Sequence, residues 1–286
     1  TEGDNNVAFG HKSLEANTTA DNNTAVGFES LKANTTASSN TAVGTCSLNA
    51  TTTGCQNTAL GMASLDTNTT GDNNVGVGYQ ALFSNTTADN NAAVGYQALS
   101  VNSTGHSNNA FGYRALRCNT TASNNTAVGF ESLCSNTTST GNTAVGFEAL
   151  KANTDNGDNT AVGCRAMLAT TTGHSNTALG ALALDTNTTG CFNTSIGSLS
   201  LAANLTANNN TAVGYQTMVA TTTGADNVGV GLGALAVNTT GSTNVAFGTS
   251  TLGSHTTGGS NTGIGGAAGY QLTTGSNNLL LGKNAG

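Results

Sequence analysis

The side chains that could carry chemistry are few and lie far apart along the chain. The four histidines are His11, His106, His174 and His255. His106 and His174 occupy the same position of an internal repeat, but four repeats separate them, which corresponds to about 19 Å if the repeats stack at β-strand spacing. A zinc ion holds its ligands at about 2 Å, so this pair predicts no metal site. We expect all four histidines to face solvent at corners of the fold.

The acidic residues and cysteines also lack a catalytic or metal-binding spacing. The six cysteines include no CxxC pair, and no calcium-binding nonapeptide of the form GGxGxDx occurs. Several aspartates fall at expected corners, where turn formation explains them: Asp21, Asp72, Asp89, Asp158 and Asp226. Catalysis requires groups that converge in a cleft. We therefore expect no enzymatic activity, no cofactor and no metal.

One pair of cysteines has a spacing of interest. Cys118 lies six residues after one repeat glycine, and Cys134 lies five residues after the next. Strand spacings of about 4.8 Å across and 3.3 Å along put their Cα atoms about 6 Å apart, which suits a disulfide. We predict that this is the closest cysteine pair within the chain. Six independent thiols are the alternative, because successive side chains of a strand face opposite ways.

A repeat of 17 residues runs through the chain without insertion or deletion, from Gly10 and Gly27 to Gly282. The residue four before each glycine is always Asn, and the residue one before is always large and apolar. The residues two before and three after are small, apart from Leu280. The residue four after is Leu or Met except in the last two repeats, and mostly Asn-Thr-Thr and a Gly or Ala follow.

The repeat predicts an all-β fold, a parallel β-solenoid of 17 coils with 17 residues each. Thr-Ala-Val before the glycine is typical of a short strand, a second extended stretch carries the Leu, and Asn and Gly form corners. No segment of 10–12 residues keeps a helical period. We expect the large apolar side chains of both stretches to point into the core: Val26, Val43, Leu60, Leu31, Leu48 and Leu65.

The asparagine that precedes each glycine by four residues forms a row along the solenoid. We expect an internal ladder in which each side chain bonds backbone groups of neighbouring coils, and a role limited to turn geometry is the alternative. The row contains Asn6, Asn23, Asn40, Asn57, Asn74, Asn91, Asn108 and Asn125.

A second row of interest consists of aromatic residues directly after the glycine. It is formed by Tyr79, Tyr96, Tyr113, Phe130 and Phe147. The row could be an exposed strip that contacts carbohydrate or protein, or it could pack between coils or between chains.

Asn-x-Thr sequons are frequent, and in a eukaryotic source they could carry dense glycosylation. The alternative is that Asn-Thr-Thr is simply a corner of the coil. The sequons begin at Asn17, Asn34, Asn68, Asn85, Asn119, Asn136, Asn187 and Asn238.

The overall composition excludes several classes of function. Charged residues make up 7% of the chain, whereas about 25% is usual for globular proteins. The net charge of −7 is spread without a basic patch, so we expect no nucleic-acid partner. No apolar run approaches the roughly 18 residues of a membrane span, so we expect no membrane insertion.

The thin expected core favours association of several chains. Burying about two large side chains per coil contributes roughly 3–6 kcal/mol, whereas ordering 17 residues costs on the order of 17–34 kcal/mol. The rows of small residues would let another chain approach closely. Residues 1–286 form one continuous repeat domain that starts and stops within a repeat. Solenoids need capped ends, so we expect a segment of a longer fibre protein.

The segments NAAVGYQALS (91–100) and NTAVGFEALKANT (142–154) resemble a known family. They are similar to YadA-like head repeats of trimeric autotransporter adhesins and to shaft repeats of phage tail fibres, and the resemblance covers the whole chain. It implies a left-handed parallel β-roll, assembly as a homotrimer, and an extracellular place in a virion tail fibre or on a cell surface. It also implies attachment to a host or surface, with a glycan or protein as partner. The adhesin repeats are shorter than those of this chain.

Stacked threonines suggest a different function, that of an ice-binding β-solenoid. Threonine pairs recur as Thr18-Thr19, Thr35-Thr36 and Thr52-Thr53. A flat outward face of Thr at β-strand spacing can order water. Adjacent side chains of a strand point to opposite sides, so only one Thr of each pair should face outward.

Overall fold

The computed structural model describes residues 3–286, so Thr1 and Glu2 of the first repeat lie outside the described residues. This part of the chain contains seventeen strands of three residues each and no helix. The strands are β1 (Val7–Phe9), β2 (Thr24–Val26), β3 (Thr41–Val43), β4 (Thr58–Leu60), β5 (Val75–Val77), β6 (Ala92–Val94), β7 (Asn109–Phe111), β8 (Thr126–Val128), β9 (Thr143–Val145), β10 (Thr160–Val162), β11 (Thr177–Leu179), β12 (Thr194–Ile196), β13 (Thr211–Val213), β14 (Val228–Val230), β15 (Val245–Phe247), β16 (Thr262–Ile264) and β17 (Leu279–Leu281).

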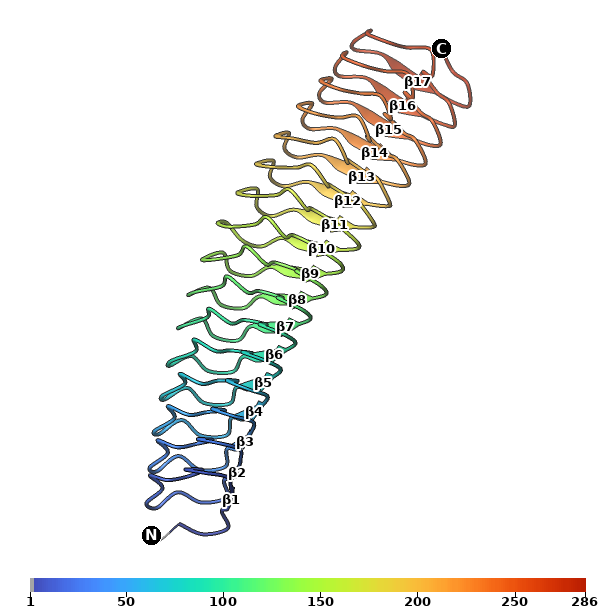
Figure 1. The fold of residues 1–286 in the computed structure, drawn as a ribbon. Coiled ribbons are helices and arrows are strands. Elements are labelled where there is room, and N and C mark those ends of the chain that lie inside the picture. The colour runs from blue at the N-terminus through green and yellow to red at the C-terminus, as the bar shows by residue number, and fades with distance from the viewer. Residues whose placement is uncertain (1–2) are drawn as a thin grey trace. The chain divides into compact units, whose positions relative to one another are not determined.

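The chain divides into two compact units, Thr1–Asn142 and Thr143–Gly286. Strands β1 to β8 pair in sequence order within the first unit, and β9 to β17 do so within the second (Figure 1). Every one of these pairings is parallel, and each strand follows the previous one after one 17-residue coil. The predicted all-β parallel solenoid is therefore confirmed. A single continuous domain, the left hand of the coil and the trimer stay predictions.

The register of the strands follows the repeat directly. Thr24, Ala25 and Val26 of β2 lie beside Thr41, Ala42 and Val43 of β3, and the other printed pairs keep the same 17-residue offset. Parallel strands need a crossover between them, and here the remainder of each coil is that crossover. Because side chains of one kind recur at the same position in every coil, they form rows along the stack.

The strands turn their middle residue inward and the two flanking residues outward. Ala25, Ala42 and Ala59 are fully buried, whereas Leu60 is 39% exposed, and Val26 and Val43 are half-buried. The prediction that Val26, Val43 and Leu60 point into the core is wrong. The interior leaves little room at the middle position, because a Cβ built on Gly76 of β5 would lie only 2.5 Å from Ser64 Oγ.

The predicted core leucines, four residues after each glycine, are confirmed. Leu31, Leu48 and Leu65 have no exposed surface. The small residues three after the glycine, such as Ser30 and Ala81, are also fully buried. The prediction that rows of small residues admit a second chain is therefore wrong, because both rows fill the interior of the coil.

The stretch that carries the leucine is a series of turns rather than the expected second extended stretch. Glu29 and Leu31 both have left-handed backbone, with φ values of 54° and 47°. Their amide groups still bond neighbouring coils, from Glu29 N to His11 O in one direction and from Leu31 N to Ser47 O in the other. Left-handed φ is rare for residues other than glycine, so the stacked hydrogen bonds must hold this backbone in place.

The left-handed backbone of the core leucines predicts that methionine is tolerated better than isoleucine at these positions. We expect Leu82→Ile to destabilise the fold by about 2–3 kcal/mol, since a β-branched side chain is strained at the φ of 53° found there. Leu82→Met should cost less than about 1.5 kcal/mol, because Met167 and Met218 hold the same place with φ near 50°. Urea unfolding of both variants tests the order. Equal losses would contradict the backbone explanation.

Candidate interaction surface

The outward residues of the strands and the residue after each glycine line up along each unit, and many of them are large and apolar. We call this surface the outer strip and define it as the residues three before, one before and one after each repeat glycine. Among the described residues, the exposed large apolar side chains outside the strip are Val101, Phe192, Leu205, Val237 and Tyr270. Those on the strip are Val7, Phe9, Phe28, Leu60, Met62, Val75, Tyr79, Tyr96, Phe111, Tyr113, Val128 and Phe130 in the first unit, and Phe147, Leu179, Ile196, Tyr215, Leu232, Phe247, Ile264, Leu279 and Leu281 in the second.

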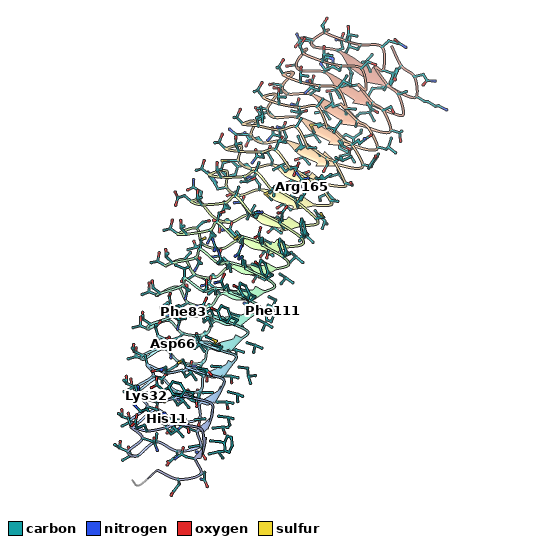
Figure 2. All side chains as sticks on the ribbon, viewed as in Figure 1. His11, Lys32, Asp66, Phe83, Phe111 and Arg165 are labelled. Carbon is teal, nitrogen blue, oxygen red and sulfur yellow. The ribbon has the colours of Figure 1, made fainter. Side chains whose placement is uncertain are left out.

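The glycine row in the middle of the strip is required by the backbone. Gly78 has a φ of +127°, and a Cβ built on it would lie 2.5 Å from the carbonyl oxygen of Gly95. A side chain would therefore collide with the next coil as well as strain the backbone. In many coils this backbone-only row separates two large exposed side chains, as Gly112 separates Phe111 from Tyr113. Figure 2 shows Phe111 on the outside of its coil.

The predicted aromatic row lies within the strip, and it is both packed and exposed. Tyr79, Tyr96, Tyr113 and Phe130 stack in sequence with ring centroids 5.0–5.2 Å apart and interplanar angles of 6–17°. Phe147, the last member, is exposed in the second unit. Because the rings cover one another's faces, they present mainly their edges outward. This favours contact with another apolar surface over stacking on a sugar ring.

Charged side chains avoid the outer strip. Of its described positions, the only Lys, Arg, Asp or Glu is Lys283. The other lysines and arginines stand two or five residues after the glycine: Lys12, Lys32, Arg114, Arg117, Lys151 and Arg165. Ion pairs form there, including Lys32 with Glu29 at 2.9 Å and Arg165 with Asp185 at 3.6 Å. Depletion of charge is a mark of interface cores.

The predicted asparagine row lies behind the strip and holds successive coils together. Asn91 N donates to Asn74 Oδ1 at 3.0 Å, and Asn91 Nδ2 donates to the carbonyl of Gly105 in the next coil at 2.9 Å. Equivalent bonds recur along the row, beginning with Asn23 N to Asn6 Oδ1. From Asn23 to Asn125 its side chains are almost completely buried. The predicted ladder is thus confirmed, and the role of these asparagines is not limited to turn geometry.

A second asparagine ladder, which was not predicted from the sequence, lies seven residues after the glycine. Asn85 Nδ2 donates to Asn68 Oδ1 at 2.9 Å and to Ala88 O at 3.0 Å, and Asn102 repeats the pattern. These asparagines begin the Asn-x-Thr sequons, and all but Asn17 of the eight have no exposed surface. Glycosylation of the folded chain at the buried sequons is therefore excluded. The ladder could have been predicted from the recurrence of Asn seven residues after the repeat glycine.

The second ladder breaks where another residue replaces asparagine. Asn34, Asn204 and Asn238 each keep a buried Oδ1 without a hydrogen bond. The next coils carry Thr51, Thr221 and His255 at the ladder position. The prediction of a solvent-facing His255 is wrong: it is fully buried in the ladder, with Nε2 2.8 Å from the carbonyl of Gly258.

The two threonines of each corner play different parts, as expected. The first donates its hydroxyl to the next coil, as Thr69 Oγ1 does to Thr86 O at 2.9 Å. The second is exposed, as at Thr70. An exposed Thr lies nine residues after the glycine in every complete described coil except one, which has Asp155 at that position. The result is a single outward row of threonines in each unit.

The other candidate residues do not converge. His11 and His106 are exposed and His174 is half-buried. The carboxylates of Asp21, Asp72 and Asp89 accept amide hydrogen bonds from the preceding coil, as expected of corner residues. Residues 3–286 contain no group of three or more His, Cys, Asp or Glu that could hold a metal ion. Nor do they contain a helix long and apolar enough to cross a membrane.

One pocket of about 330 Å³ lies at the end of the second unit. Its lining consists of Gly269, Gln271, Leu272, Asn278, Leu280 and Gly286. None of these side chains titrates near neutral pH, so the side chains that line the pocket supply no acid or base.

Burial raises the pKa of the Asp66 carboxyl above its usual value, and the Glu29 carboxylate adds to the shift. A raised pKa means that the folded chain binds the proton more tightly. This contribution to stability is present at low pH and is lost as pH rises through the folded pKa. Burial also raises the pKa of Asp185, although Arg165 opposes the shift.

Removing the charge of Asp66 should therefore stabilise the fold near neutral pH. We expect Asp66→Asn to increase the free energy of unfolding at pH 7 by up to about 1 kcal/mol after solvent screening. Asn49 occupies the same place one coil earlier, so the side chain fits. Thermal unfolding at pH 7 and at pH 3 provides the test. The gain should vanish at pH 3, and a gain at both values would exclude the charge as its cause.

No protein-family model matches the chain, and no curated protein matches it. Most of the exposed large apolar side chains among residues 3–286 lie on the outer strip, which makes it the candidate contact surface.

Proposed function

We propose that this chain is a non-enzymatic structural segment of an extracellular fibre, and that it assembles as a parallel, in-register homotrimer through the outer strip. The observation that carries the proposal is the strip itself. Soluble monomers rarely expose continuous apolar patches larger than a few hundred Å², whereas here exposed Val, Leu, Ile and aromatic side chains recur along both units.

The occupant that fits the strip best is another copy of the same chain. A second copy carries rows at the same 17-residue spacing, so large side chains of one copy can lie over the glycine row of the next throughout. Only a partner of equal repeat length keeps this match from coil to coil. Closed symmetry with identical contacts is also the usual state of homo-oligomers.

The fibre role follows from this assembly. A chain built of repeats extends one coil at a time, and the asparagine hydrogen bonds between successive coils suit a rigid spacer. We place it in a phage tail-fibre shaft or a cell-surface adhesin, where it separates an anchor from a tip and contacts a host glycan or protein. The resemblance of segments 91–100 and 142–154 to such repeats supports this placement.

The mass in solution tests the proposal. Light scattering on the purified chain of 28.1 kDa should give about three chain masses. A stable monomer at micromolar concentration would overturn the proposal. A dimer would retain the strip as an interface but exclude the trimer.

The exposed threonine row favours a second candidate, an ice-binding solenoid. Thr70 and its equivalents present one hydroxyl and one methyl group per coil, as a surface that orders water would require. The row is only one residue wide, since the neighbouring threonines bond backbone carbonyls. Thermal hysteresis would support this candidate, and replacing Thr70, Thr87 and Thr104 by Ala should then abolish it.

A further inference from the structure

Two cysteines of adjacent coils lie beside one arginine in the first unit. Cys118 and Cys134 flank strand β8, and Cys118 N donates to Cys134 O at 3.1 Å. Both cysteines are present as free thiols. A direct backbone hydrogen bond brings the two Cα atoms within the roughly 4.4–6.8 Å that disulfides span.

The side chain at the position of Cys118 leans toward the next coil. Thr67 and Thr186 hold the same place in their own coils. Their hydroxyls donate to the carbonyls of Phe83 and Ala202, each at 2.7 Å. Phe83 and Ala202 lie five residues after the next repeat glycine, which is also the position of Cys134 in the coil after Cys118. A side chain at position 118 therefore points toward the backbone of residue 134 in the next coil, which answers for Cys118 the objection that strand side chains alternate.

Arg117 supplies a positive charge to this pair. Its Nη2 atom lies 3.8 Å from Cys118 Sγ, and its guanidinium also interacts with the Cys134 thiol. Arg114 and Arg165, by contrast, lie 3.8 and 3.6 Å from the carboxylates of Glu131 and Asp185. A guanidinium at this distance is placed to stabilise the negative charge that a sulfur carries during thiol–disulfide exchange.

We propose that Cys118 and Cys134 are an oxidisable dithiol, which small disulfides such as glutathione disulfide convert into a bond that staples two adjacent coils. Cys118 is the more exposed thiol, whereas Cys134 is 8% exposed. Cys118 therefore meets the oxidant first and Cys134 resolves the intermediate. Burial raises the pKa of the Cys134 thiol, Cys118 adds to the shift and Arg117 opposes it. A thiol that stays protonated is the poorer first nucleophile, which leaves the first attack to Cys118.

Glutathione disulfide accepts the two electrons that the two thiols lose. The Cys118 thiolate attacks one sulfur of glutathione disulfide, forms a mixed disulfide and releases one glutathione thiolate, which takes up the proton lost by Cys118. The Cys134 thiolate then attacks Cys118 Sγ and displaces the second glutathione, which takes up the proton of Cys134. Two protein thiols are oxidised, and one glutathione disulfide is reduced to two thiols.

The experiment uses the full chain with its four other cysteines, Cys46, Cys55, Cys164 and Cys191, replaced by Ser. After incubation with glutathione disulfide, we expect a mass lower by two hydrogen atoms, a 118–134 cross-linked peptide and a melting temperature higher by a few degrees. Non-reducing electrophoresis should show a single chain. A stable glutathione adduct or a disulfide between chains would overturn the proposal.

Two further variants test the roles of the residues. Arg117→Ala should slow the oxidation several-fold, while Arg114→Ala, a neighbouring arginine paired with Glu131, should leave the rate unchanged. Cys134→Ser should retain glutathione on Cys118. Equal rates in both arginine variants would exclude a role for Arg117. In the unmodified chain, preferential formation of another cysteine pair would exclude the proposed site.

Discussion

Replacing Gly78 by alanine should destabilise the fold by about 4 kcal/mol or more, the range of exceptional single substitutions. The new Cβ would lie 2.5 Å from the backbone oxygen of Gly95, and the backbone there has a φ of +127°. Neither the oxygen nor the φ can shift without breaking the stacked hydrogen bonds of the next coil. Urea unfolding and hydrogen exchange should show the loss, centred on residues 61–95.

A matched control separates this effect from any glycine substitution. Gly266 directly follows the repeat glycine Gly265, its φ lies outside the left-handed range, and a Cβ there would meet no atom within 4 Å. We expect Gly266→Ala to change the stability by less than about 0.5 kcal/mol. Similar losses for both variants would contradict the stacking argument.

Placing a charge on the outer strip should block association without unfolding the chain. Phe111 is 41% exposed in the single chain, so Phe111→Lys has little to disturb within its own coil. In the assembly, each copy would bury an unpaired ammonium group, at a cost of about 2–5 kcal/mol per site. We expect the apparent dissociation constant to rise at least about 100-fold, as measured by sedimentation.

Thr104→Lys is the matched control for this prediction. Thr104 belongs to the exposed threonine row of the coil before Phe111 and lies outside the strip. The variant should assemble as the unmodified chain does, with an unchanged circular dichroism spectrum. If Phe111→Lys also assembled normally, the outer strip would not be the interface.

The candidate site was predictable only in part. The aromatic row at Tyr79, Tyr96 and Tyr113 was visible, because aromatic residues at a constant interval are conspicuous. The apolar residues one before the glycine, such as Val26 and Leu60, were instead assigned to the core, because large apolar residues next to small ones suggest an inward side chain. The second ladder at Asn68 and Asn85 was hidden, because the same residues match a glycosylation signal and a corner.

The sequence by itself determined the period, the parallel register and the buried leucines, because an uninterrupted 17-residue repeat permits only one stacking of like upon like. Tertiary structure decided which face of the strand is inside. Two rows of buried asparagine and one of leucine fill each coil, so the middle strand position admits little more than Ala, Ser or Gly, and Val26 turns outward. It also decided the left-handed backbone of Leu31, which no local propensity favours and which the hydrogen bonds of adjacent coils impose.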